Sequence, residues 1–295
     1  MKIQVWGARG SIPSPCPDTV RFGGNTSCVT VEYDNFFIIF DAGSGIRLFG
    51  DWLLNNKRGL KGHLFFTHYH SDHIQGFPFF APAYIPGNKL AIYGTNYHDK
   101  VVKDILAQLM KSPTCPVGLE TMKGDLGFIG LEKEDTQKII FEDTLVAIVK
   151  NMPLRHPDGA VGYRLEDMKT GRIFAYATDT EHKEDGSLDE NLKSLAKGAD
   201  ILFYDAQYTR EEYYGLNGKM SKKTWGHSTW EEGIRIADAA GVKELFLFHH
   251  DPSHTDSMLT DIENRAGDYL KKNKEKFKKL NSVKIAYEGL TIISE

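Results

Sequence analysis

Four potential metal ligands lie directly after an apolar run, and this feature constrains the chain more than any other. Residues 67–73 read Thr-His-Tyr-His-Ser-Asp-His. Because alternate residues leaving a strand point the same way, His68 and His70 can bind one ion. Asp72 and His73 would then face a second ion. Neutral imidazole and carboxylate are donors that zinc accepts, and a solvated turn would have no reason to follow a buried strand, so the segment predicts a metal site.

Further apolar, strand-like segments also end in a carboxylate or a histidine. They lead to Asp41 (after 37–40), His156 (after 143–149), Asp179 (after 171–177), Asp205 (after 201–204) and the pair His249 and His250 (after 245–248). Residues that follow a strand are positioned by the rigid sheet behind them. We therefore expect folding to gather these distant side chains around the 68–73 segment.

The 68–73 segment resembles the H-x-H-x-D-H signature of the metallo-β-lactamase superfamily. The later histidines and aspartates follow in that family's order of motifs, so the resemblance spans almost the whole chain. It implies an α/β fold, a four-layer αββα sandwich with two mixed sheets between helical layers. Because no linker or internal repeat is visible, we expect one metallo-β-lactamase-like domain over residues 1–295.

The resemblance also implies two divalent metal ions, with zinc as the first choice and manganese or iron(II) as alternatives. The first ion would be held by His68, His70 and His156, and the second by Asp72, His73 and His249, with Asp179 between them. Asp41 would orient a ligand histidine rather than bind metal. His249 is preferred to His250 because it leaves the end of the strand directly, and His250 stays open as the alternative.

A second group of residues resembles the ribonuclease Z and phosphodiesterase branch of this family. His227, Ser228 and Thr229 match its His-Ser-Thr motif, and Asp205 with Ala206 matches its Glu-Ala motif with a shorter acidic side chain. The resemblance implies that His227 contacts the scissile phosphate and Asp205 orients it, while Asp72 accepts a hydrogen bond from the nucleophile. The alternative is a histidine of a helix-capping loop without a catalytic role.

The start of a helix is signalled directly after His227. Ser228 with Glu231, and Thr229 with Glu232, are both spaced as capping boxes. The N-terminal glycine-rich turn at 7–13 permits the close backbone approach that a nearby metal loop or phosphate requires. Aromatic residues could wall a pocket that stacks a base or could equally belong to the core: Phe77, Phe79, Phe80, Trp225 and Trp230.

The charge of the chain bears on its substrate. The net charge is −4 and the pI is near 6.3, and the interval between residues 73 and 156 has no dense basic cluster of the kind that grips transfer RNA. Since cations dominate affinity for nucleic acid, the sequence argues against a large RNA. It favours a metal-dependent hydrolase of a small phosphodiester such as a cyclic nucleotide, using two ions about 3.5–4 Å apart.

Several other functions remain open. They are a transfer RNA 3′-processing endonuclease, an ester, thioester or lactam hydrolase of the same fold, and a noncatalytic binding module stabilised by metal. A redox diiron enzyme is less favoured, because that branch usually has glutamate where His70 stands. The three cysteines, Cys16, Cys28 and Cys115, suggest no disulfide framework. Without a signal peptide or an apolar span, we expect a cytoplasmic protein without membrane contact, and a homodimer is allowed.

Hydrophobic periodicity predicts mixed strands and covering helices. Strands are expected near 2–6, 28–33, 36–41, 63–67, 89–93, 144–150, 160–166, 171–177, 200–204, 244–248 and 290–294, and helices near 46–56, 97–111, 188–197, 229–240 and 256–279. The basic run at 271–279 is interpreted as the solvated end of the last helix, since cations favour a helix C-terminus.

Overall fold

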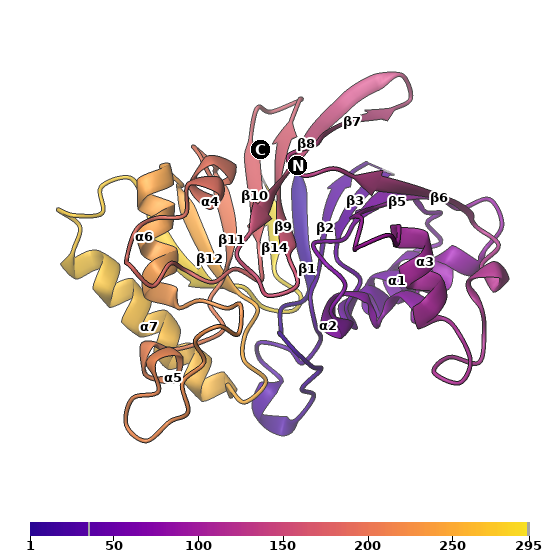
Figure 1. Cartoon of the computed structure of the whole chain (residues 1–295). Helices are drawn as coiled ribbons and strands as arrows, with labels where there is room; N and C mark the ends of the chain where they lie inside the picture. The colour runs from indigo at the N-terminus through magenta and orange to yellow at the C-terminus, as the bar shows by residue number, and fades with distance from the viewer. Residues whose placement is uncertain (35, 294–295) are drawn as a thin grey trace. The chain divides into compact units, whose positions relative to one another are not determined.

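The computed structural model describes residues 1–34 and 36–293, and the chain divides into two compact units. The first unit comprises Met1–Pro13, Gly23–Glu132 and Glu288–Glu295, and the second comprises Ser14–Phe22 and Lys133–Tyr287. Each unit is built on its own seven-stranded mixed sheet, as can be followed in Figure 1. The two sheets with their helices agree with the α/β class expected from the sequence.

The sheet of the first unit combines antiparallel and parallel pairs. Its order is β14 (Thr291–Ile293), β1 (Lys2–Gly7), β2 (Cys28–Tyr33), β3 (Phe36–Phe40), β4 (Lys61–Phe65), β5 (Lys89–Thr95) and β6 (Asp125–Leu131). The strands from β3 to β6 are parallel, and the others pair antiparallel. Because parallel strands end at the same edge, β3 and β4 deliver Asp41 and the 67–73 loop side by side.

Helices cover the first sheet with regularly spaced apolar residues. The helices are α1 (Gly45–Asn55), α2 (Ser71–Ile74) and α3 (Val102–Leu109), with 3₁₀ turns at Phe77–Phe79, Ala81–Tyr84 and Leu119–Thr121. Ile46, Phe49 and Leu53 of α1 share one helical face and are fully buried in the same core as Leu64 of β4. This packing fixes the strand that leads into the predicted metal loop.

The sheet of the second unit has antiparallel strands at one side and parallel strands at the other. Its order is β13 (Ser282–Ile285), β12 (Glu244–Phe248), β11 (Ile201–Asp205), β10 (Ile173–Ala177), β9 (Ala160–Asp167), β8 (Thr144–Leu154) and β7 (Thr136–Phe141). The strands from β7 to β10 pair antiparallel, and those from β10 to β13 are parallel. The carboxyl ends of β10, β11 and β12 therefore present Asp179, Asp205 and His249 at one edge of this sheet.

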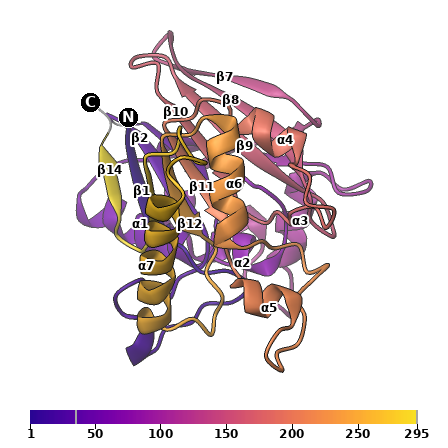
Figure 2. The same cartoon turned by 90° about the vertical axis from the view of Figure 1, so that its left-hand side faces the viewer.

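Four α-helices belong to the second unit: α4 (Glu190–Leu195), α5 (Arg210–Tyr214), α6 (Trp230–Ala240) and α7 (Asp256–Lys272), after a 3₁₀ turn at Pro17–Thr19. Helix α6 packs on β11 and β12 and α7 packs on β13, and the two helices lie side by side in Figure 2. Ile234 of α6 and Ile262 of α7 are buried in one core with Leu245 of β12. The helices thus hold in place the strands that carry the predicted site residues.

The structure corrects several predicted boundaries. The strand before the metal loop is Lys61–Phe65, and the helix expected at 97–111 covers only Val102–Leu109. The last helix ends at Lys272, because Phe277 and Leu280 turn back into the core while the lysines around them stay exposed. Strands β6, β7 and β13 and helix α5 were not expected from the periodicity.

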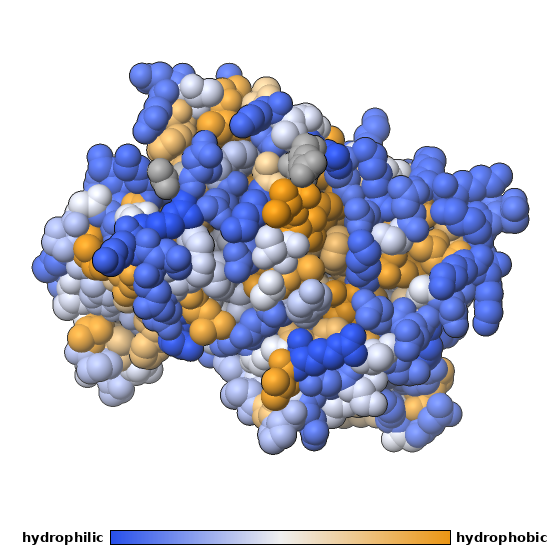
Figure 3. All heavy atoms as spheres, turned by 180° about the vertical axis from the view of Figure 1, so that it is seen from behind, coloured by the Kyte–Doolittle hydropathy of each residue, from blue (hydrophilic) through white to orange (hydrophobic). Residues whose placement is uncertain are grey.

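Hydrophilic residues predominate on the face drawn in Figure 3, where hydrophobic residues form separate smaller groups. Within residues 1–34 and 36–293, no helix is both long and apolar enough to cross a bilayer.

Candidate metal centre and phosphate site

The four predicted ligands of the first unit lie together after β4. The ring centroids of His68 and His70 are 4.6 Å apart, and those of His68 and His73 are 4.3 Å apart. Asp72 Oδ2 lies 3.3 Å from Nε2 of His73. His68, Asp72 and His73 are buried, and His70 is partly exposed. The loop therefore gathers three imidazoles and a carboxylate, a donor set that suits zinc.

Asp41 is the first residue after β3, and its carboxylate holds both the metal loop and one of its histidines. Its Oδ2 accepts a hydrogen bond from Nδ1 of His73 at 2.9 Å, and its Oδ1 accepts one from the backbone N–H of Thr67 at 2.8 Å. With Nδ1 bound to a carboxylate, Nε2 of His73 is the nitrogen suited to a metal. This contact is the one expected of a carboxylate that orients a ligand.

The N-terminal turn also reaches this loop. The backbone N–H of Ser11 donates to Asp72 Oδ2 at 2.7 Å, and Ser11 has a left-handed φ of 63°. Gly43 lies on the other side, where an added Cβ would be 2.2 Å from the carbonyl oxygen of Asp72. The 7–13 turn thus contacts the metal loop through Ser11, and a close backbone approach to Asp72 is permitted by Gly43.

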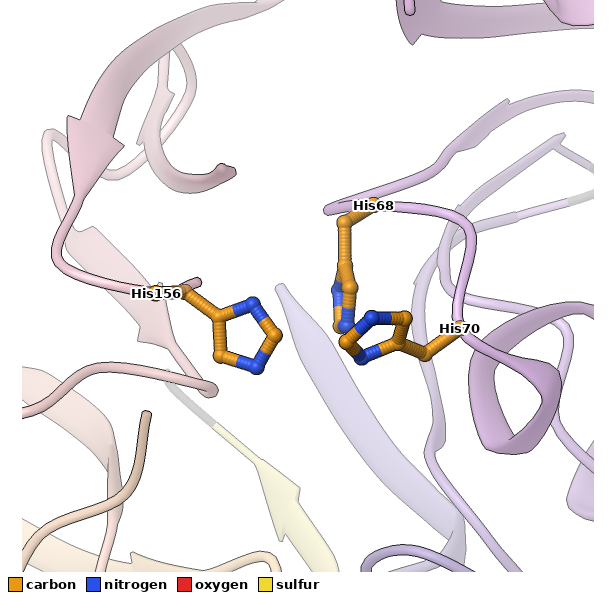
Figure 4. A group of neighbouring side chains, drawn as sticks. All are labelled: His68, His70 and His156. Atoms are coloured by element: carbon orange, nitrogen blue, oxygen red, sulfur yellow. The ribbon is translucent and has the colours of Figure 1, made fainter. Parts of the chain in front are cut away.

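The second unit contributes its own cluster of imidazoles and carboxylates. His156 follows β8, Asp179 follows β10 and His249 follows β12. Asp179 Oδ1 is 3.7 Å from His156 Nε2, and Asp179 Oδ2 is 3.3 Å from His249 Nε2. All three side chains are at least 98% buried. Figure 4 draws His156 on the turn after β8, and His68 and His70 on the loop after β4.

The adjacent histidines at the end of β12 have different surroundings. His249 faces Asp179, whereas His250 donates from Nε2 to the carbonyl oxygen of Ala286 at 2.7 Å. Nε2 of His250 is thus engaged by the backbone directly after β13. The geometry therefore favours His249 as the ligand, as expected from its register, although its metal role stays a prediction.

His227 and Asp205 form a pair beside this cluster. Asp205 Oδ2 is 2.8 Å from Nδ1 of His227, so the shorter aspartate spans the distance. The His227 ring stacks on that of His249 with centroids 4.9 Å apart, and its Nδ1 is 3.9 Å from Asp179 Oδ1. Donor atoms of Asp179, Asp205, His227 and His249 all lie within 4.8 Å of one another. The predicted phosphate residues thus adjoin the predicted metal ligands of this unit.

The capping boxes expected after His227 are not formed as predicted. Helix α6 begins after Thr229, but the Thr229 side chain accepts no capping hydrogen bond from the backbone of the first turn. The Ser228 hydroxyl instead accepts a hydrogen bond from Tyr204 at 2.7 Å and lies 2.9 Å from Nδ1 of His182. Burial lowers the pKa of His182, which keeps this imidazole neutral. Ser228 therefore anchors the His227 loop to β11 rather than capping the helix.

Glu181 is a site residue that the sequence did not reveal. Its carboxylate accepts hydrogen bonds from the backbone N–H groups of Thr224 and Gly226, at 2.8 and 3.2 Å, and from the Tyr213 hydroxyl at 2.6 Å. Glu181 lies two residues after Asp179, so one short segment carries a predicted ligand and fixes the loop before His227. Its position directly after the Thr-Asp-Thr segment was the only signal in the sequence.

Three site residues that end strands share a rare backbone conformation. The φ angles of Asp41, Asp179 and His249 are 60°, 58° and 62°. Such left-handed values are uncommon for residues other than glycine, and they cluster at functional sites where surrounding structure holds them. Three predicted site residues that follow strands thus share one left-handed backbone conformation.

Comparison with known proteins decides the family. The model of the β-lactamase superfamily domain matches residues 38–250, a span that contains Asp41 and His249 and every predicted ligand between them. The chain belongs to the metallo-β-lactamase superfamily. The α/β fold expected for that superfamily, with two mixed sheets and covering helices, is thereby confirmed.

Relatives place this metallo-β-lactamase-fold hydrolase in the ribonuclease Z and phosphodiesterase-like branch. Ribonuclease Z of Picrophilus torridus is 23% identical over 298 residues, which cover 88% of each chain. The short form of human tRNase Z has a TM-score of 0.63 at 19% identity, with 99% of each chain covered. Unliganded yeast PDE1 has a TM-score of 0.67 at 16% identity, also covering 99% of each chain. The two structural likenesses concern the fold alone.

Proposed function

We propose that this metallo-β-lactamase-fold hydrolase is a dinuclear phosphodiesterase that acts on a small phosphodiester such as a cyclic nucleotide. The observation that carries the proposal is the buried pair of His227 and Asp205, 2.8 Å apart and next to Asp179 and His249. An imidazole oriented by a carboxylate beside metal ligands suits a reaction that needs a proton donor at a phosphate.

The donors fit divalent metal ions. Imidazole nitrogens and carboxylate oxygens, buried and turned toward one another in each unit, are ligands that zinc accepts. We propose that residues 1–295 act as one domain and hold two ions. His68, His70 and His156 would bind the first, and Asp72, His73 and His249 the second, with Asp179 shared. Bound ions would act as Lewis acids on the phosphoryl group and acidify the attacking water.

The chain's own residues would perform the remaining tasks. Asp72 would accept a hydrogen bond from the attacking water. Because Nδ1 of His227 donates to Asp205, the protonated ring would donate from Nε2 to a nonbridging phosphate oxygen or protonate the leaving alkoxide. Tyr208 lies edge-on to His227, and burial, followed by the negative charge of Asp205, raises the pKa of its phenol. It would therefore remain a neutral hydroxyl beside the site.

The structure of the segment between His73 and His156 supports the proposal of a small substrate. Between His73 and His156 the chain forms β5, α3 and β6 to β8, and α3 packs on β5 and β6. The stretch is thus used for sheet and helix packing rather than for a basic arm. Since phosphate neutralisation by cations dominates RNA affinity, the net charge of −4 supports a small anion.

Transfer RNA 3′-processing is the second candidate. It is favoured by the names of the relatives, since ribonuclease Z proteins from several organisms match along most of the chain. In this case the same His227 and Asp205 would serve a phosphodiester within RNA. A basic surface would then have to compensate for the acidic balance of the chain.

Elemental analysis together with a substrate panel tests the proposal. We expect about two divalent metals per chain, loss of turnover with a chelator, and recovery when zinc or manganese is added back. The panel contains cyclic AMP, a dinucleotide, a precursor transfer RNA, a thioester and a β-lactam. Turnover of the precursor RNA alone would establish the second candidate, and turnover of acyl substrates alone would overturn both. A metal-loaded protein that hydrolyses nothing would indicate a binding module.

A further inference from the structure

We propose that Trp225, with Lys222, forms a subsite that stacks the base of a nucleotide substrate. This inference rests on the proposed phosphodiesterase function and names the substrate class as a nucleoside phosphate ester. Of the two tryptophans singled out by the sequence, Trp230 is 4% exposed and packs on Tyr269 in the core. Trp225 is 47% exposed, although it lies only two residues before His227.

Gly226 holds the backbone next to Trp225 against a predicted ligand. The residue has a φ of 88°, and an added Cβ would lie 2.3 Å from Cδ2 of His156 and 2.6 Å from Cδ of Pro157. The backbone after Trp225 therefore passes directly over the imidazole of a predicted ligand. Since Trp225 lies two residues before His227, we expect its indole beside a substrate whose phosphate contacts His227.

The loop that carries the indole is fixed in position. The Glu181 carboxylate binds the backbone N–H groups on both sides of Trp225, those of Thr224 and Gly226. The Tyr213 hydroxyl donates to the same carboxylate at 2.6 Å. A ring that is exposed and yet pre-positioned stacks a base with little additional loss of conformational entropy.

One cationic side chain lies over the indole of Trp225, and two more lie over Tyr214. Lys222 Nζ lies 3.8 Å from the centroid of the Trp225 ring and 5.9 Å from that of Tyr208, which in turn stands edge-on to His227. Lys223 and Arg210 lie over Tyr214, at 5.2 and 5.0 Å.

None of these three cations pairs with a carboxylate within the described part of the chain. The nearby carboxylates of Glu181 and Glu212 are engaged elsewhere: Glu181 by the loop before His227, and Glu212 by Lys219 and His254.

Aromatic faces combined with cations are the elements with which proteins bind single nucleotides and single strands. One face of the Trp225 indole is backed by an ammonium group, so its other face suits a purine or pyrimidine. The ammonium group of Lys222 matches the negative charge of the phosphate. A substrate without a base would use His227 but would leave the indole without a partner.

Ligand binding tests the subsite without requiring turnover. The probes are adenosine 5′-monophosphate and ribose 5-phosphate, which differ by the base, titrated by calorimetry into the full-length metal-loaded protein. We expect the nucleotide to bind about tenfold more tightly than the sugar phosphate. Trp225→Leu should remove this difference, whereas Trp225→Phe should keep most of it. Equal binding of the nucleotide to wild type and Trp225→Leu would overturn the inference.

Tryptophan fluorescence locates the bound base. We expect the nucleotide to quench the wild type and Trp52→Phe, but not Trp225→Phe. Trp52 is a matched control because it too has a cation over its ring, Arg58 at 5.1 Å, but belongs to the other unit. Quenching that survives in Trp225→Phe would contradict the proposal. Absence of phosphodiester turnover with the base preference intact would overturn the proposed function alone, whereas turnover without base preference would overturn the subsite alone.

Discussion

Asp205 Oδ2 lies 2.8 Å from Nδ1 of His227, and both side chains are buried. Asp205 also accepts hydrogen bonds from the backbone N–H groups of Thr180 and Gln207. The carboxylate is thus fixed by backbone on two sides before it meets the imidazole. This arrangement sets the tautomer of His227 and directs Nε2 away from Asp205.

Replacing Asp205 should impair turnover without removing metal. We expect Asp205→Asn to lower kcat/KM for bis(p-nitrophenyl) phosphate by about 10–100-fold, because an amide supports less well than a carboxylate the doubly protonated ring that donates from both Nδ1 and Nε2. Asp167→Asn is the control, since Asp167 is also buried and holds the turn after β9. Equal losses in both variants would show that the effect is structural.

Asp41 should determine metal affinity. Asp41→Asn weakens the hydrogen bond to His73 Nδ1 and should lower zinc affinity by about 10–100-fold, measured by competition with a chromogenic chelator. Asp51→Asn serves as the control, because Asp51 is a half-exposed residue of α1 that pairs with Arg47. Unchanged zinc affinity in Asp41→Asn would refute the orienting role.

Gly226 should tolerate no side chain. Gly226→Ala places a Cβ against His156, and we expect loss of activity together with a destabilisation of more than about 2 kcal/mol by urea unfolding. Gly218→Ala is matched to it, since Gly218 has a similar φ of 79° but no atom within 4 Å of the added Cβ. The control should cost only about 1 kcal/mol, the strain of the left-handed backbone. Similar behaviour of the two variants would argue against close packing on His156.

His63 should make folding stability depend on pH. Burial lowers the pKa of His63 from 6.5 to about 4. Between these two values the imidazole is protonated in the unfolded chain and neutral in the folded chain. Stability contributed by the neutral ring is present above pH 6.5 and is lost as the pH falls toward 4. Relative to His63→Phe, the wild type should lose about 2 kcal/mol between pH 7 and 5, measured by urea unfolding at equal metal concentration. Parallel pH profiles of the two proteins would contradict this.

The sequence predicts the site better than the edges of the sheets. Strong local patterns locate the 68–73 loop and the strands that end at Asp41, Asp179 and His249, because buried strands read as apolar runs. The partly exposed strands β6 and β7 lack that pattern; β6 pairs with β5, which lies well before it in the chain, whereas β7 forms a hairpin with β8. Partners far apart in sequence also explain why Glu181 was missed.

Ser228 shows how tertiary contacts override a local signal. Its spacing from Glu231 predicts a cap, yet its hydroxyl is taken by Tyr204 on a neighbouring strand. The ligand roles, the cytoplasmic location and the homodimer expected from the sequence stay predictions.

The most direct test of the central claim is the metal content and phosphodiester turnover of His227→Ala, measured on the same preparation. We predict about two metals per chain, as in wild type, and a kcat for bis(p-nitrophenyl) phosphate lower by about 10²–10⁴-fold. Full activity in His227→Ala at full metal content would contradict the assignment of His227 to the phosphate and, with it, the phosphodiesterase account.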